Sequence, residues 1–224
     1  MRILSLIFLL SLLPTDAFAG AWPRAEGSTF LSFGTTVTTP TDALGTDINT
    51  AFSLYLERGM KRQRTFGFDL HAESTDKYTA IAFLRVPVLR RSETHKFALQ
   101  FGAGSKTNGA TNEWLLHSGV SWGRGFETKL GHGWAAVDAQ MHYFVASGEM
   151  ATKVDVTFGV KPKDRWKIMM QLQAGDYPSS DPYLRLAPSI TWEMRPGRHL
   201  EVGAQIGVHN DDRLGLKIGT WIEF

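Results

Sequence analysis

The sequence predicts an all-β fold, a closed up-and-down antiparallel barrel of about twelve strands that crosses a membrane. Three observations predict it. Apolar and polar residues alternate with a period of two along almost the whole chain after residue 20, which is typical of strands with two unlike faces. The alternating segments are about ten residues long, as a tilted strand needs to be to cross a bilayer. Each segment keeps one alternate row free of charge, as a lipid-facing surface requires.

The first residues of the chain have the composition of a secretory signal peptide. Arg2 precedes an apolar run over residues 3–13, and Ala17 and Ala19 place small side chains before Gly20. A basic residue, a short apolar run and a pair of small residues are typical of a cleaved leader. The run is also shorter than the roughly 20 residues of a membrane-spanning helix. We therefore expect cleavage of residues 1–19, and a single barrel domain over residues 20–224.

The composition excludes several classes of protein. The 224 residues include no cysteine, so disulfides, thiolate metal sites and a cysteine nucleophile are excluded. The formal net charge is +2 and the charges are scattered, which argues against a nucleic-acid partner. After the leader, no apolar run approaches the length of a spanning helix, so an inner-membrane helical protein is excluded as well. We expect a barrel without a cofactor.

The alternation predicts twelve strands, with ten as the alternative. The segments at 89–95 and 123–132 are long for turns on the side of the chain ends, which keeps the lower number open. Pro188 lies inside a predicted strand and has no amide N–H, so we expect a bulge or an edge-like irregularity there. The predicted strands cover residues 28–38, 50–58, 64–73, 77–86, 96–105, 113–122, 133–145, 152–161, 165–175, 183–194, 199–208 and 213–224.

The row opposite the charge-free row mixes glycine with charges of both signs, and we assign it to the barrel interior. Glycine weakens an exposed strand, whereas a crowded lumen gives it a use. We expect a polar network in the lumen whose charges pair with one another and give weak ion selectivity. Its predicted members are Asp69, His71, His117, Asp138, His142, Lys153, Asp155, Lys167, Arg185 and Lys217.

The outward row is predicted to carry an aromatic girdle. Cleavage of a leader places the new N-terminus in the periplasm, and an even number of strands returns the C-terminus to the same side. On that assignment, six aromatic residues fall near the periplasmic ends of the lipid-facing row, where amphipathic rings gather at bilayer interfaces. They are Phe66, Phe97, Trp122, Trp166, Trp192 and Phe224.

The leader, the alternating segments and the closing residues Thr220-Trp221-Ile222-Glu223-Phe224 resemble those of Gram-negative outer-membrane β-barrel proteins. The resemblance covers residues 20–224 and is one of architecture, so it identifies no functional subfamily. It implies an integral protein in contact with outer-membrane lipids. It also implies that the barrel-assembly machinery recognises the last strand, which ends at Phe224. We expect a monomer.

Three functional hypotheses follow. Twelve strands lie between eight-stranded barrels filled by side chains and 16-stranded porins with an aqueous channel. The first hypothesis is therefore a narrow pore for small polar solutes, or a structural envelope protein. The runner-up is an envelope lipid-modifying enzyme of the acyl-hydrolase type that uses a cluster of histidine and aspartate. The third is a secreted soluble β-sandwich with a ligand groove.

The enzyme hypothesis depends on strand register. With a turn over residues 123–132, His117 would lie opposite Asp138, and His142 would lie opposite Asp155 across the next hairpin. A histidine held by a carboxylate can act as a general base. His117 and His142 are therefore the candidate catalytic residues. A shift of two residues would separate the partners.

A nucleophile for these histidines is hard to find in the sequence. Ser121 shares the face of His117 but lies four residues along the strand, about 13 Å away. The four histidine and aspartate residues have the ligand types of a metal site. No close histidine pair supports such a site, so we expect no metal.

Overall fold

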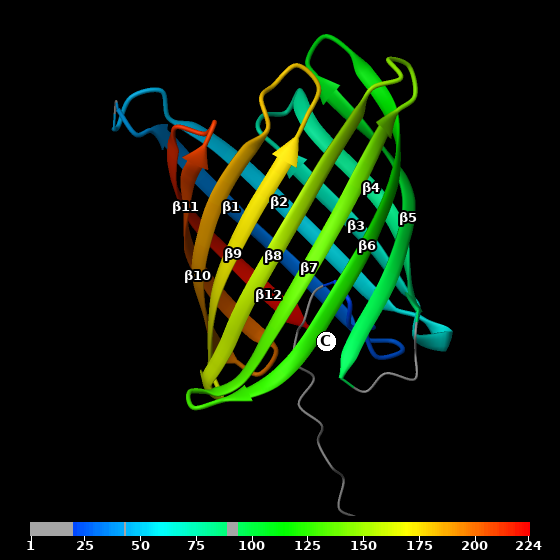
Figure 1. Cartoon of the computed structure of the whole chain (residues 1–224), viewed down its shortest axis with the longest axis vertical. Coiled ribbons are helices and arrows are strands. Elements are labelled where there is room, and N and C mark those ends of the chain that lie inside the picture. The colour runs from blue at the N-terminus through cyan, green and yellow to red at the C-terminus, as the bar shows by residue number, and fades with distance from the viewer. Residues whose placement is uncertain (1–19, 43, 89–93) are drawn as a thin grey trace, which may run out of the picture.

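The computed structural model describes residues 20–42, 44–88 and 94–224, and the predicted leader lies outside them. The described residues form a closed barrel of twelve antiparallel strands, in which each strand pairs with its chain neighbours and β1 pairs with β12 (Figure 1). The predicted fold class is confirmed, with twelve strands rather than ten. No helix of the described residues is long and apolar enough to cross a membrane.

The strands are β1 (Thr29–Pro40), β2 (Asn49–Gly59), β3 (Thr65–Ala72), β4 (Lys77–Val88), β5 (His95–Asn108), β6 (Asn112–Thr128), β7 (Gly131–Phe144), β8 (Met150–Lys163), β9 (Trp166–Asp176), β10 (Tyr183–Arg195), β11 (Arg198–His209) and β12 (Arg213–Glu223). A short 3-10 helix, η1 (Lys61–Gln63), lies between β2 and β3. We call the end of the barrel where β1 begins and β12 ends the terminal end, and the opposite end the loop end.

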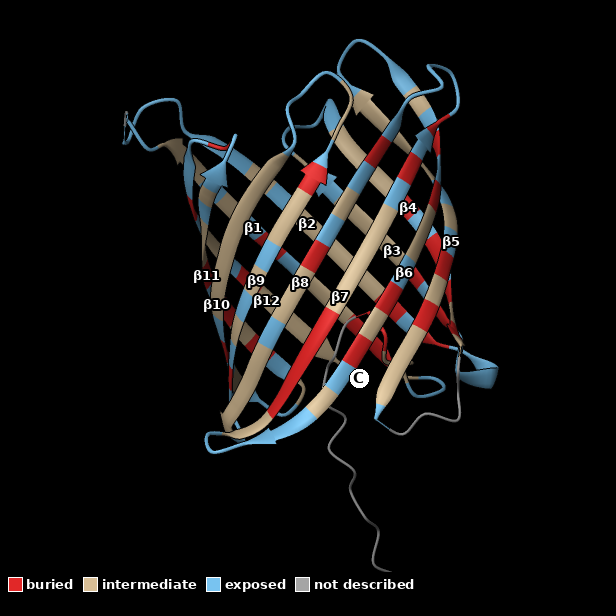
Figure 2. Cartoon of the chain, viewed as in Figure 1, coloured by how far each residue is buried: buried red, intermediate tan, exposed pale blue. Residues whose placement is uncertain are grey.

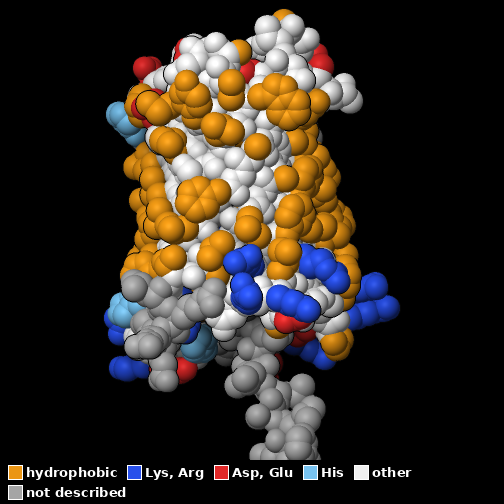
Figure 3. Space-filling view, turned by 90° about the vertical axis from the view of Figure 1, so that its right-hand side faces the viewer, with side chains coloured by type: hydrophobic (Ala, Val, Ile, Leu, Met, Phe, Trp, Pro, Cys, Tyr) orange, Lys and Arg blue, Asp and Glu red, His pale blue; other side chains and the backbone are white. Residues whose placement is uncertain are grey.

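The outer wall of the barrel is apolar, as the sequence predicts. On β6 and β12, the side chains of Leu116, Val120, Leu216 and Ile218 point outward and are exposed. Apolar side chains cover the face of the barrel in Figure 3, and Lys and Arg side chains gather below them toward the terminal end. A continuous apolar surface of this size is expected in contact with lipid rather than water. Because the sheet closes on itself with its apolar side outward, the β-sandwich hypothesis is wrong.

The six aromatic residues of the predicted girdle all lie near the terminal end. Phe97 pairs with Trp122 across β5 and β6, and Trp166 stacks on Trp192 with ring centroids 5.9 Å apart. Phe66 stands near the start of β3, and Phe224 follows β12. Their function at a membrane interface stays a prediction.

The hairpin between β6 and β7 differs from the prediction. Only Lys129 and Leu130 connect the two strands, so the predicted turn over 123–132 is wrong. The glycines of this stretch read as turn residues, but Gly123 faces the lumen, where the ring of Trp22 leaves no room for a Cβ atom. Close packing rather than a turn therefore explains glycine at that position.

At Pro188 the structure shows an edge-like irregularity rather than a bulge. Pro188 stays in register with Met170 of β9, but neither Ala187 nor Pro188 pairs with β11, so the ladder on that side is interrupted. The register shifts of β10 lie on either side of it, between Leu184 and Arg185 and between Glu193 and Arg195. An outward-facing proline is accommodated here without an inserted residue.

Candidate functional site: the barrel lumen

The lumen-facing side chains differ between two parts of the barrel. We call those of β2–β7 the packed wall and those of β8–β12 the polar wall. Buried positions are frequent on β6 and β7, whereas β10 is mostly half-buried or exposed (Figure 2). The packed wall combines an apolar cluster with a buried ion network, and the polar wall presents half-buried lysine, arginine and glutamine side chains.

The apolar cluster fills the lumen on the packed wall. Ile81 and Phe83 of β4, Leu115 of β6 and Phe144 of β7 are buried together. Glycines on β3 and β5 face the Phe83 side chain, and a Cβ atom at either position would collide with it. Sequence reasoning missed this cluster because both rows of β4 are largely apolar. Arg85 was the available signal, since a charge on that row directs Phe83, two residues earlier, into the lumen.

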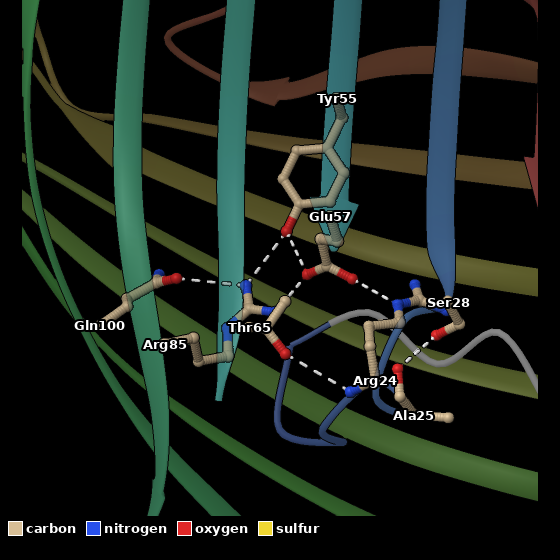
Figure 4. Close-up of polar contacts among 8 residues, drawn as sticks. All are labelled: Arg24, Ala25, Ser28, Tyr55, Glu57, Thr65, Arg85 and Gln100. Atoms are coloured by element: carbon tan, nitrogen blue, oxygen red, sulfur yellow. Dashed lines mark hydrogen bonds and ion pairs between the residues drawn. The ribbon is translucent and has the colours of Figure 1, made fainter. Parts of the chain in front are cut away.

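A buried ion network adjoins the apolar cluster at the terminal end (Figure 4). The carboxylate of Glu57, with 0% of its side chain exposed, pairs with Arg85 and with Arg24, whose Nε donates at 2.6 Å. The hydroxyl of Tyr55 donates to Glu57 Oε1 at 2.7 Å, and Arg85 Nη2 donates to Gln100 Oε1 at 3.1 Å. Charge-assisted hydrogen bonds of this kind are the strong ones. The network joins β2, β4 and β5 to the segment before β1.

That segment, residues 20–28, lies within the terminal end of the barrel. Its Gly27 N–H donates to the Gly59 carbonyl at 3.0 Å, and the Gly59 N–H donates to the Ser28 carbonyl at 2.9 Å. Ala21 is buried, and the ring of Trp22 lies against β6. The segment therefore crosses from β1 to the packed wall.

The structure corrects the predicted histidine pairs. Trp122 lies opposite Val137, a register four residues away from the predicted one, because the β6–β7 hairpin is tight. His117 therefore lies opposite His142, with ring centroids 5.1 Å apart, and the predicted partner Asp138 lies opposite Ser121.

Across the next hairpin, His142 lies opposite Ala151 rather than Asp155. Asp155 lies opposite Asp138 instead. Each predicted histidine–aspartate pair is therefore absent from the described strands, and the two aspartates face one another across β7 and β8.

The histidines do not assemble a nucleophile and base among the described residues. Neither ring nitrogen of His117 has a hydrogen-bond partner there. The Ser121 hydroxyl donates to Asp138 Oδ1 at 2.6 Å, so it is held by the carboxylate rather than by a histidine. The described part of the chain also holds no group of three or more residues able to ligate a metal ion.

The polar wall brings together most of the remaining predicted charges, and Lys153, Arg185 and Lys217 each pair with a carboxylate. Lys153 Nζ lies 2.7 Å from Asp155 Oδ2, and Lys217 Nζ lies 2.9 Å from Glu201 Oε2. Lys167 is buried, with its Nζ 5.6 Å from the centre of the Trp221 ring. A ring of like charges gives strong ion selectivity, and the alternation of sign leaves no such ring among the described residues of this wall.

Arg185 reaches toward the loop end, where its Nη2 lies 2.5 Å from Asp211 Oδ2. Burial raises the pKa of Asp211, but hydrogen bonds from Arg213 and Arg185 outweigh it and hold that pKa below its usual value. Asp69 borders a small lumen cavity that Arg85 also lines. His71, the last predicted member, is exposed near the loop end of β3.

Glutamines form the middle of the polar wall. Gln173 Nε2 donates to Gln171 Oε1 at 2.5 Å, and Gln171 Nε2 donates to the Thr157 hydroxyl at 3.2 Å. Both glutamines are half-buried. Their amides can therefore exchange hydrogen bonds with water or with a polar solute.

Comparison with known proteins identifies the fold. No protein-family model matches the chain, and no curated protein matches it. The NanC porin structure is similar with a TM-score of 0.60 and 11% sequence identity, over 86% of this chain and 98% of that chain. The COG4313 outer membrane channel from Pseudomonas putida F1 is similar with a TM-score of 0.58 and 10% identity, over 94% and 99%. The chain therefore has the fold of integral outer-membrane β-barrels, in agreement with the location predicted from its sequence.

Proposed function

We propose that this protein is an outer-membrane pore that conducts small polar solutes through a narrow passage along its polar wall. The observation that carries the proposal is the contrast between the two walls. The packed wall is closed by buried apolar side chains and a buried ion network, whereas the polar wall, although it also holds buried residues such as Lys167 and Glu201, presents partly exposed lysine and glutamine side chains. A water-filled passage therefore runs along the polar wall.

The packed wall supports this path because it leaves little space. The apolar cluster and the Glu57 network fill their part of the lumen, and residues 20–28 lie against the same side at the terminal end. The buried Glu57 carboxylate pairs with two guanidiniums, and such a buried network holds its strands together.

The polar wall supports a passage for small polar solutes without strong charge preference. Lys153 and Lys217 keep 29% and 32% of their side chains exposed although each pairs with a carboxylate. Together with Gln171 and Gln173 they provide donors and acceptors that can replace the hydration of a solute step by step. The two structures of similar fold are described as a porin and as an outer membrane channel, which supports the same class of function.

Planar-bilayer recording tests the proposal. We expect small, ohmic single-channel steps from the folded protein, with weak preference between small anions and cations. A heat-unfolded sample provides the control. Gln173→Trp should reduce the steps, whereas an exposed outer-wall change, Leu116→Trp, should leave them unchanged. Absence of steps above background in a folded preparation would overturn the pore and leave the structural envelope protein.

We also propose that the last strand is the feature that the barrel-assembly machinery recognises. Phe224 pairs with Thr29 through two backbone hydrogen bonds of 2.6 and 3.0 Å, so it lies at the seam where the barrel closes. Deletion of Phe224 should lower the amount of folded protein in outer membranes, as measured by heat-modifiable migration in gels. Normal insertion of the deletion variant would contradict the proposed recognition of the last strand. A monomer in contact with outer-membrane lipids remains our expectation.

A further inference from the structure

The first described residue of the chain lies against an acidic side chain on the opposite side of the lumen. Gly20 is buried, and a Cβ atom added to it would lie 2.8 Å from Asp138 Oδ2 and 2.9 Å from Cγ. The Asp138 carboxylate of β7 is therefore in contact with the Gly20 backbone. Residues 20–28 thus span the terminal end of the barrel from β1 to β7.

The cation whose charge acts on Asp138, Arg85, is paired with Glu57, and Asp138 forms no direct ion pair among the described residues. Its hydrogen-bond donor there is the Ser121 hydroxyl, at 2.6 Å, and no lysine or arginine of the described ranges lies within 4.0 Å of it. Its cross-strand neighbour is a second carboxylate, Asp155, which pairs with Lys153. A partly buried carboxylate beside another one is unfavourable without a positive partner. Asp138 therefore has the surroundings of an acceptor for one more cation.

Processing of the chain would supply that cation. Hydrolysis of the Ala19–Gly20 amide, by a leader peptidase and one water molecule, leaves a carboxylate on Ala19 and an amine on Gly20. A free α-amine is largely protonated at neutral pH. The α-nitrogen is one bond from the Gly20 Cα, and thus within reach of the Asp138 carboxylate.

We propose that cleavage before Gly20 creates an α-ammonium that pairs with Asp138, and that this pair anchors residues 20–28 as an internal strap across the terminal end. The Arg24–Glu57 pair is the second anchor, four residues along the strap. The inference goes beyond the proposed pore function and does not depend on it. It rests on the predicted cleavage site.

The requirement for glycine at position 20 fits the same arrangement. Gly20 has a φ of +84°, a conformation that side chains disfavour, and an added Cβ would collide with Asp138. Before cleavage, the Gly20 nitrogen is a neutral amide. The first anchor therefore forms only in the processed protein, whereas the Arg24 anchor needs no processing.

Amine labelling of the protein purified from outer membranes tests the proposal. Intact mass should show a chain that begins at Gly20; another first residue would overturn the proposal. A reagent selective for α-amines near pH 7 should then label folded wild-type protein slowly. An ammonium paired with a carboxylate gives up its proton about tenfold less readily, so Asp138→Asn should be labelled roughly fivefold faster or more.

Glu201→Gln provides the matched control. It removes a lumen carboxylate of the polar wall, which pairs with Lys217 and lies on another strand, and it should leave the labelling rate unchanged. Equal rates for wild type and Asp138→Asn, in folded protein, would overturn the anchor. So would an acceleration of the same size in Glu201→Gln.

A second variant keeps the test valid if Asp138→Asn fails to fold. One alanine inserted between Ala19 and Gly20 leaves Phe18 at the minus-three position for cleavage after the new residue, so we expect it to stay on the mature chain, which mass verifies. The insertion moves the ammonium by about 3.8 Å. Faster labelling is expected, and an unchanged rate would contradict the proposal. None of these measurements requires conductance, so failure of the pore proposal would leave them unaffected.

Discussion

The two walls of the lumen are built from the same alternating strands but hold different interiors. On the packed wall, Glu57 is fully buried and shared by two guanidiniums. On the polar wall, Glu201 pairs with Lys217, which is one third exposed. The difference teaches that a polar lumen row does not by itself make a channel. Whether such a row is packed or hydrated depends on the side chains that meet it across the lumen.

The largest expected effect is on the packed wall. Glu57→Gln leaves Arg24 and Arg85 buried without their common carboxylate, and breaking a buried pair in this way costs about 3 kcal/mol or more. Urea unfolding of the barrel in lipid vesicles measures the loss. Glu201→Gln is the comparison on the polar wall, where Glu201 is buried but its partner Lys217 is one third exposed to water. The glutamine amide oxygen can still accept from Trp221 Nε1, so the loss should be smaller, about 1 kcal/mol. Similar losses for the two variants would contradict the distinction between the walls.

A smaller effect of opposite sign is expected at His117. Both of its ring nitrogens are buried without a partner among the described residues, and the ring lies beside Phe83. His117→Leu removes two unsatisfied polar atoms, so the free energy of unfolding should rise by about 1 kcal/mol. The same urea titration measures it. A marked loss of stability would show that the imidazole has a partner, such as ordered water, that the packed wall requires.

Acid should weaken the loop end of the polar wall. The pKa of Asp211 is held low, against the effect of burial, by hydrogen bonds from Arg213 and Arg185. A carboxyl with a lowered folded pKa stabilises above its unfolded value of about 4 and loses that contribution as the pH falls through the folded value.

The test compares wild type with Asp211→Asn. The variant should melt about 2 °C lower near pH 6, and this gap should narrow steadily as the pH falls below about 4. A gap that persists in acid would mean that Asp211 acts through packing rather than through its charge.

The smallest expected effect is on selectivity. Lys217→Glu places a second carboxylate beside Glu201 on the polar wall and should shift the ratio of cation to anion permeability by about twofold. Reversal potentials in a salt gradient measure it. Lys106→Glu on the packed wall is the matched charge change; its ammonium lies over the ring of Phe144. An equal shift in the permeability ratio from both variants would show that the current does not run along the polar wall in particular.

Much of the fold could be predicted from the sequence because one physical rule fixes it. A charge-free row must face lipid, so Leu116 and Val120 point outward whatever their partners are. Register needs more than that rule. The turn between β6 and β7 consists of Lys129 and Leu130, residues without turn character, and the misplaced turn moved His117 away from its predicted partner.

The packed wall could not be predicted from the sequence for a related reason. Phe83 sits on a strand whose two rows are both largely apolar, so only the charges of Lys77 at its start and Arg85 near its end distinguish them. Residues 20–28 lie close to β6 and β7, although more than a hundred residues separate these parts of the chain. No local sequence pattern encodes this contact. By contrast, Lys153, Asp155 and Lys217 were predicted lumen residues because their rows alternate cleanly.

Thiol labelling of the two walls tests the central claim most directly, because the natural chain has no cysteine to interfere. Gln173→Cys places a thiol on the polar wall, and Gln100→Cys places one on the packed wall, where the wild-type residue is 1% exposed. We predict that a small charged thiol reagent modifies the first in the folded protein and reduces its current, and that it modifies the second only after unfolding. Equal modification of both, or modification of Gln100→Cys alone, would contradict a passage along the polar wall.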